Sequence, residues 1–161
     1  HQLIMPLFLH FGWVHWACNV VSLASLALSL EVLAGPAMVI FLFFFSGVAS
    51  IMVSLEMNPQ VTSLGCSGAV FGMLAARVVH SWWPPQAGDR FRWLIVVLLV
   101  AALTFLPTLH LPVDHAAHWG GFVAGVVGYV AWRLGWLTRS LALAALLAWA
   151  AWETRQPRLP F

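Results

Sequence analysis

Six long apolar segments, each bounded by residues that favour turns, constrain the fold of this chain more than any other feature. They occupy residues 11–30, 36–54, 66–81, 91–106, 115–134 and 136–152. An apolar stretch of about 20 residues is long enough to cross the hydrocarbon core of a bilayer as an α-helix. Hydrophobic residues make up 62% of the chain and charged residues only 7%, whereas soluble domains carry about 25% charged residues. The sequence therefore predicts an all-α polytopic membrane protein whose six transmembrane helices form a single domain over residues 1–161.

The charges indicate an orientation in the membrane and speak against one class of partner. All seven basic residues are arginines. Arg77, Arg90, Arg92, Arg133 and Arg139 fall on one side of the predicted bundle, and Arg155 and Arg158 fall on the other. Because cytoplasmic loops carry the excess of positive charge, the first side is expected to face the cytoplasm. A net charge of +2 without any basic run does not predict a nucleic-acid partner.

The two cysteines, Cys18 and Cys66, lie in apolar segments and form no CxxC pair. Such cysteines are most simply small buried thiols, so neither a zinc site nor a disulfide framework is predicted. We expect no cofactor and no metal.

Polar side chains gather at the predicted outer ends of three helices. These are His10, His15 and Asn19 near the first helix, Ser67 at the start of the third, and Asp114, His115 and His118 at the start of the fifth. Ionisable and amide groups are costly inside a membrane and are therefore functional candidates. Each also has a structural interpretation, since a serine can bond to its own helix, a histidine can join two helices and Asp114 can cap the fifth helix. A nucleophile and a candidate base at the same depth favour the functional interpretation.

Two rows of small residues predict how these groups come together. One row is Gly68, Gly72 and Ala76 in the third segment, and the other is Gly121 and Gly125, with Gly128 beyond, in the fifth. Small residues four apart let two membrane helices approach closely. His118 lies three residues before Gly121 and shares its helix face. Packing on these rows would therefore bring His118 close to Ser67.

Three motifs together resemble those of rhomboid-family intramembrane serine proteases. His15-x-x-x-Asn19, preceded by His10, resembles the family's second transmembrane helix. Gly65-Cys66-Ser67-Gly68, followed by Phe71 and Gly72, resembles its GxSG nucleophile helix. Ala117-His118-x-x-Gly121-x-x-x-Gly125 resembles its sixth helix. A lone GxSG is weak evidence, but three motifs in the same order and at matching membrane ends are specific, and the resemblance covers nearly the whole chain.

The resemblance implies a fold and a reaction. The fold would be a rhomboid-like helical bundle with a core over about residues 6–134, lacking the family's first helix and carrying an extra C-terminal helix over about 136–152. The reaction would be hydrolysis of peptide bonds in or near transmembrane segments of membrane proteins, through an acyl-enzyme. The partners would be transmembrane protein substrates and the lipid bilayer. The expected location is a bacterial cytoplasmic membrane, with the site open to its outer face.

The same resemblance suggests roles for individual residues. Ser67 would be the nucleophile and His118 the general base and acid of a dyad. The Ser67 backbone N–H, His15 and Asn19 would stabilise the oxyanion. Supporting positions would be Gly65, Gly68, Phe71, which would pack on the His118 ring, Gly121, Gly125 and His10.

Two alternatives stay open, and so does the oligomeric state. The first is a proteolytically inactive rhomboid-like protein that binds membrane clients, although it would have no need of Ser67 and His118. The second is a haem or metal membrane protein using His10, His15, His115 and His118. That interpretation leaves Asn19 and the GxSG sequence unexplained, and the sequence contains no HExxH or CxxCH motif.

Overall fold

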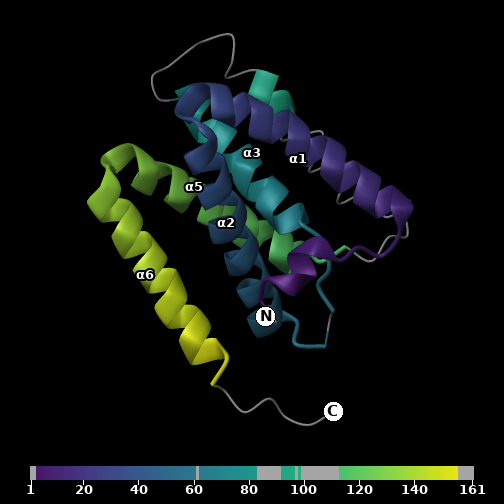
Figure 1. The fold of residues 1–161 in the computed structure, drawn as a ribbon. Coiled ribbons are helices and arrows are strands. Elements are labelled where there is room, and N and C mark those ends of the chain that lie inside the picture. The colour runs from purple at the N-terminus through teal and green to yellow at the C-terminus, as the bar shows by residue number, and fades with distance from the viewer. Residues whose placement is uncertain (1–2, 61, 83–91, 97, 99–112, 156–161) are drawn as a thin grey trace.

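The computed structural model describes residues 3–60, 62–82, 92–96, 98 and 113–155, and within them the regular structure is entirely helical (Figure 1). A short 3-10 helix, η1 (Met5–Phe8), is followed by α1 (Trp13–Ala34), α2 (Pro36–Met57), α3 (Ser67–Trp82), α5 (His115–Leu134) and α6 (Trp136–Glu153). The chain is thus an all-α polytopic membrane protein, as its sequence predicts.

The observed helices agree with five of the six predicted segments. α1 and α2 each contain 22 residues and are apolar enough to cross a membrane. At 1.5 Å per residue each is about 33 Å long, which matches a hydrocarbon core about 30 Å thick. Both helices extend beyond the predicted ends, α1 to Ala34 and α2 to Met57. Of the predicted segment at 91–106, residues 92–96 and 98 are helical, and the remainder lies outside the described residues.

Glycine and proline explain the tight connections between successive helices. Gly35 has a φ of 80°, which L side chains rarely adopt, and it ends α1. Pro36 follows at the first position of α2, where its missing N–H costs no hydrogen bond. Gly135, with a φ of 115°, separates α5 from α6 in the same way. Each pair of helices therefore turns sharply back across the membrane.

The centre of the bundle is formed by α2, α3 and α5, each of which packs against the other two, while α6 lies outside them against α5 and α2 (Figure 1). One face of α2 carries the fully buried hydroxyls of Ser46, Ser50 and Ser54. Ser46 donates to the carbonyl of Leu42, and Ser50 to that of Gly47 at 2.7 Å. Ser46 and Ser50 thus satisfy their hydroxyls within α2 while remaining small, so α2 can approach Gly72 and Gly68 of α3 closely.

The predicted contact between glycine rows is confirmed for two pairs. A Cβ atom added to Gly121 would collide with the backbone of Gly68, and one added to Gly125 would collide with the backbone of Gly72. Gly128 does not continue this row, although its spacing alone would suggest a contact with α3. A Cβ at Gly128 would instead lie 3.1 Å from side-chain atoms of Leu42 and Phe45 on α2. The row turns away because successive steps of three and four residues move around the helix, and α2 occupies the neighbouring face.

Candidate active site

Ser67 and His118 lie within hydrogen-bonding distance although 51 residues separate them in the sequence. Ser67 is the first residue of α3, and His118 lies in the first turn of α5. The distance between Ser67 Oγ and His118 Nε2 is 2.9 Å. The backbone contact of Gly121 with Gly68 holds the two helix starts together, so the pair is positioned by main-chain packing.

The imidazole of His118 is oriented by an aromatic stack. The rings of Phe71 and His118 are nearly parallel, with centroids 4.2 Å apart and an interplanar angle of 12°. The second ring nitrogen, Nδ1, is buried and has no hydrogen-bond partner among the described residues. No carboxylate in the described part of the chain therefore bonds this nitrogen as an aspartate would in a catalytic triad.

Asp114 is committed to two other contacts. Its Oδ1 accepts from the backbone N–H of Ala117 at 3.0 Å, which caps α5. Its Oδ2 accepts from the hydroxyl of Ser54 on α2. The capping interpretation of Asp114 is thus confirmed, and the carboxylate joins the starting turn of α5 to α2.

His15 and Asn19 lie directly over the turn that precedes Ser67. A Cβ on Gly65 would lie 2.8 Å from His15 Cε1 and 3.2 Å from Asn19 Nδ2. Gly65 also has a φ of 111°, and its N–H donates to the carbonyl of Pro6 at 2.8 Å. Only glycine satisfies both the backbone angle and the close approach, so Gly65 is what allows α1 to cover the nucleophile turn.

The polar groups of His15 and Asn19 are arranged as donors. The backbone N–H of Phe11 donates to His15 Nδ1 at 3.4 Å, and a neutral imidazole that accepts at Nδ1 carries its proton on Nε2. Asn19 is only 6% exposed, and its Nδ2 has no hydrogen-bond partner among the described residues. Because a buried unsatisfied amide is costly, this donor is available for an acceptor outside the described residues.

These side chains share one cavity of about 250 Å³. Its polar lining comes from His15, Asn19, Thr62, Ser63, Ser67, Asp114 and His118, and the rest of its wall from Phe11, Val14, Cys18, Leu64 and Val113. Cys18 is exposed, whereas Cys66 is buried. Sequence reasoning did not assign Cys18, Thr62 or Ser63 to the site. Cys18 could have been found from its spacing, because it lies three residues after His15 on the same face of α1.

His10 lies beside this cavity rather than in its wall. Its Nε2 is 3.9 Å from the thiol sulfur of Cys66, and its ring meets that of His15 edge-on at 5.2 Å. His10 therefore contacts both the nucleophile turn and a cavity residue. Within the described residues, no group of three His, Cys, Asp or Glu side chains converges as a metal site would require.

Comparison with known proteins finds relatives of one family. A family model described as the Rhomboid domain matches residues 1–136. The chain is 31% identical to RHOMBOID-like protein 5 of Arabidopsis thaliana, over 80% of this chain and 43% of that protein. It is 30% identical to Rhomboid-like protease 3 of Toxoplasma gondii, over 78% of this chain and 49% of that protein.

A further relative is named as inactive. Inactive rhomboid protein 2 of Homo sapiens is 31% identical over 93% of this chain and 19% of that protein. The chain thus spans less than half the length of each of these relatives. The family match covers every residue of the cavity described above, and the identities agree with it. The chain therefore belongs to the rhomboid family.

Proposed function

We propose that this protein is an intramembrane serine endopeptidase that cleaves transmembrane protein substrates. The observation that carries the proposal is the 2.9 Å contact between Ser67 Oγ and His118 Nε2 in a cavity that also holds the unsatisfied amide of Asn19. A nucleophile, a base and a free donor around one cavity are the parts that acyl transfer requires.

The proposed reaction has two stages. In the first, Ser67 Oγ attacks the scissile carbonyl while its proton passes to His118 Nε2, and His118 then protonates the leaving amine. In the second, His118 takes a proton from water, which hydrolyses the acyl-enzyme. The stack on Phe71 supports this role, because it keeps Nε2 directed at Ser67 without a third hydrogen-bonded group.

Three donors are available for the negative charge that develops on the substrate oxygen. The backbone N–H of Ser67 lies in the first turn of α3, where N–H groups have no partner within the helix. Asn19 Nδ2 and His15 Nε2 face the same turn from α1. Donors fixed before the reaction stabilise the transition state without reorganisation, and we assign these three groups to the oxyanion.

We place the cavity on the outer side of the membrane. His118 lies in the first turn of α5, while Arg133 lies in the last turn of the same helix and Arg139 in the first turns of α6. Since arginine-rich ends face the cytoplasm, the cavity opens to the opposite side. The bilayer is then one partner and a membrane protein that presents a peptide bond at the outer face is the other. A bacterial cytoplasmic membrane stays a prediction, because the relatives named above are eukaryotic.

A fluorophosphonate probe tests the proposal directly. Ser67 Oγ should attack the phosphorus and release fluoride, so the purified protein should be labelled. Ser67→Ala should abolish labelling, and His118→Ala should reduce it strongly because the base is lost.

A second candidate function is the binding of membrane clients without cleavage, and two relatives are named as inactive rhomboid proteins. Inactive rhomboid protein 1 of Rattus norvegicus is 32% identical over 78% of this chain, and inactive rhomboid protein 2 of Homo sapiens was noted above. If the folded wild-type protein is neither labelled by the probe nor able to cleave any transmembrane reporter, this candidate replaces the protease.

A further inference from the structure

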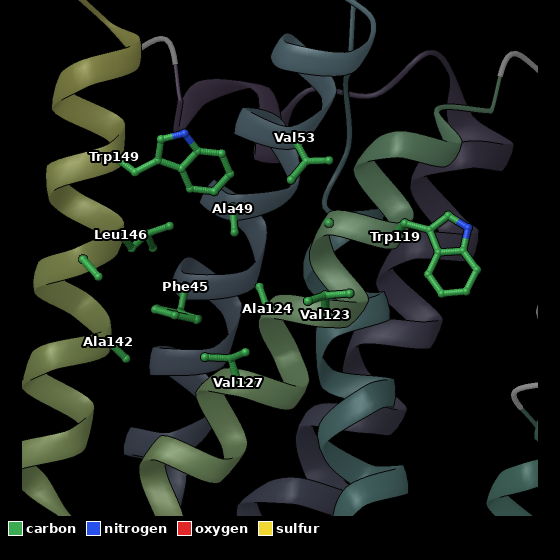
Figure 2. Close-up of a pocket in the computed structure, with 12 residues that line it drawn as sticks. Phe45, Ala49, Val53, Trp119, Val123, Ala124, Val127, Ala142, Leu146 and Trp149 are labelled. Atoms are coloured by element: carbon green, nitrogen blue, oxygen red, sulfur yellow. The ribbon is translucent and has the colours of Figure 1, made fainter.

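A second cavity lies on the opposite side of α5 from the Ser67–His118 pair. Its volume is about 510 Å³, and it is bounded by α2, α5 and α6 (Figure 2). On α5 it is lined by Gly120, Ala124 and Val127, which do not share the face of His118 and Gly121. α6 forms the other wall and begins where the family match over residues 1–136 ends. We call this cavity the α6 groove.

The groove exists because α6 leans away from α5. The two helices meet at Gly135 and separate toward Trp119 and Trp149 (Figure 2). α6 is held to α2 by buried Leu146, which packs in one cluster with Phe45 and Ala49. It is also held by a hydrogen bond in which Trp149 Nε1 donates to Glu56 Oε1 at 2.6 Å.

The floor of the groove is rigid, whereas its mouth is open. A Cβ on Gly120 would lie 2.7 Å from Val53 Cβ, so α5 and α2 are already in tight contact. The facing residues of α6 include Ala142 and Ala145, whose small side chains do not fill the gap. Val123 on the rim is 56% exposed.

The lining of the groove limits what can occupy it. Almost all of its residues are apolar, and an apolar cavity does not hold ordered water. A helix with its side chains is about 10 Å wide, so it could seat only one face in the open mouth of the groove. An extended peptide would bring backbone N–H and C=O groups that nothing in the lining could satisfy. A hydrocarbon chain is thin and has no polar groups, so it fits this lining.

We propose that the α6 groove binds one acyl chain of a phospholipid from the leaflet on the side of the Ser67 cavity. From Trp119 to Val127 the groove follows α5 for eight residues, about 12 Å at 1.5 Å per residue. One leaflet contributes about 15 Å of a hydrocarbon core about 30 Å thick, so the groove has the depth of a single leaflet.

The polar groups at the mouth of the groove fit the other end of such a lipid. Trp119 and Trp149 lie at its wide end, and indole rings tend to lie at the level of lipid headgroups (Figure 2). Glu56, the partner of Trp149, closes the α2 side at that level. The headgroup therefore lies beside Trp149 and Glu56, and the acyl chain runs inward between Ala124 and Ala142.

Native mass spectrometry of the purified full chain tests the proposal. The protein is reconstituted with palmitoyl-oleoyl phosphatidylcholine and released into a mild detergent. The wild-type protein should retain a bound phospholipid. Ala142→Phe, which fills the groove, should lose it, whereas Ala144→Phe should keep it. Ala144 is an exposed residue of the same helix outside the groove, so the control adds the same bulk to a lipid-facing position.

Further measurements distinguish an acyl chain from other occupants of the groove. Single-chain lysophosphatidylcholine should displace the bound lipid, and glycerophosphocholine, which has the headgroup without acyl chains, should not. Ala145→Leu fills the groove with a smaller change and should also lose the lipid if Ala142→Phe fails to fold. Equal retention by the Ala142 and Ala144 variants would overturn the proposal. A wild-type dimer that Ala142→Phe dissociates would also overturn it, in favour of a second copy. Because no step involves cleavage, the result is independent of the proposed protease activity.

Discussion

The proposed chemistry depends on a few side chains whose contacts are already formed in the absence of substrate. His118 Nε2 lies 2.9 Å from Ser67 Oγ, and Phe71 fixes the plane of the imidazole. We expect His118→Ala to lower cleavage of a transmembrane reporter in vesicles by about 10²–10⁴-fold, because general base catalysis is lost. Ser67→Ala should abolish cleavage. Both variants should express and melt like the wild-type protein. Full activity in either variant would show that Ser67 and His118 do not act as a catalytic dyad.

Asn19 should act on turnover more than on substrate affinity. Its Nδ2 is unsatisfied in the cavity, so the bond it makes should strengthen as charge forms on the oxyanion. We expect Asn19→Ala to lower kcat by about 10²–10³-fold with little change in KM. His15→Ala should behave in the same way. An unchanged kcat with a raised KM would instead make these residues part of substrate binding.

Cys18 should make the proposed protease sensitive to thiol reagents. Its side chain is exposed in the cavity wall next to Asn19, whereas Cys66 is only 5% exposed. N-ethylmaleimide should therefore alkylate Cys18 first and block the cavity. We expect cleavage to fall in parallel with labelling in the wild-type protein and to persist in Cys18→Ser. Equal inhibition of both proteins would show that another group is modified.

The helices differ in how firmly they hold the site, and the contact of α3 with α5 is the least tolerant. A single methyl group at Gly121 would meet the main chain of Gly68, which cannot move without displacing Ser67. We expect Gly121→Ala to lower activity by about 10²-fold, since a shift of about 1 Å at the reacting groups has that effect. Its melting temperature should also fall.

Gly128→Ala is the matched control on the same helix. Its added methyl would lie 3.1 Å from side-chain atoms of Leu42 and Phe45, whereas a methyl on Gly121 would collide with the main chain of α3. The loss of activity should be much smaller. Comparable losses in the two variants would mean that the glycine contact with α3 does not position the dyad.

The positions of the helices could be predicted from the sequence, but which neighbour each helix face contacts could be predicted only in part. Long apolar segments broken by Gly35-Pro36 and Gly135 define α1, α2, α5 and α6 almost completely. The spacing of Gly121 and Gly125 correctly predicts their contact with α3. The spacing of Gly128 does not predict its contact with α2, because that depends on where a third helix lies. The bond from Ser54 to Asp114 is similarly invisible, since 60 residues separate its partners.

For the molecule as a whole, α6 is attached more loosely than the central helices. The sequence predicts a helix at 136–152 but not its tilt, which follows from the few contacts made by Leu146 and Trp149. The α6 groove could therefore not be foreseen. Most of the polar side chains of the Ser67 cavity could be predicted, because their motifs are specific.

The bond between Trp149 and Glu56 should stabilise the attachment of α6 without affecting the dyad. A hydrogen bond at an exposed site contributes about 0.5–1.5 kcal/mol. We expect Trp149→Phe to lower the melting temperature by a few degrees, at about 2–4 °C per kcal/mol, with cleavage nearly unchanged. Trp152→Phe is the control, because Trp152 is 57% exposed near the same end of α6. A melting temperature that falls equally in both variants would show that the bond to Glu56 contributes nothing.

The separation of 51 residues between Ser67 and His118 has a consequence for biosynthesis. A ribosome delivers the chain from its N-terminus, so α3 is synthesised before α5. Until α5 is made, the serine has no base, and the glycine of α5 that locks the two helices together does not yet exist. On the proposed function, a chain made in this order gains its general base only when α5 is in place, so cleavage could not begin while α5 is still being inserted.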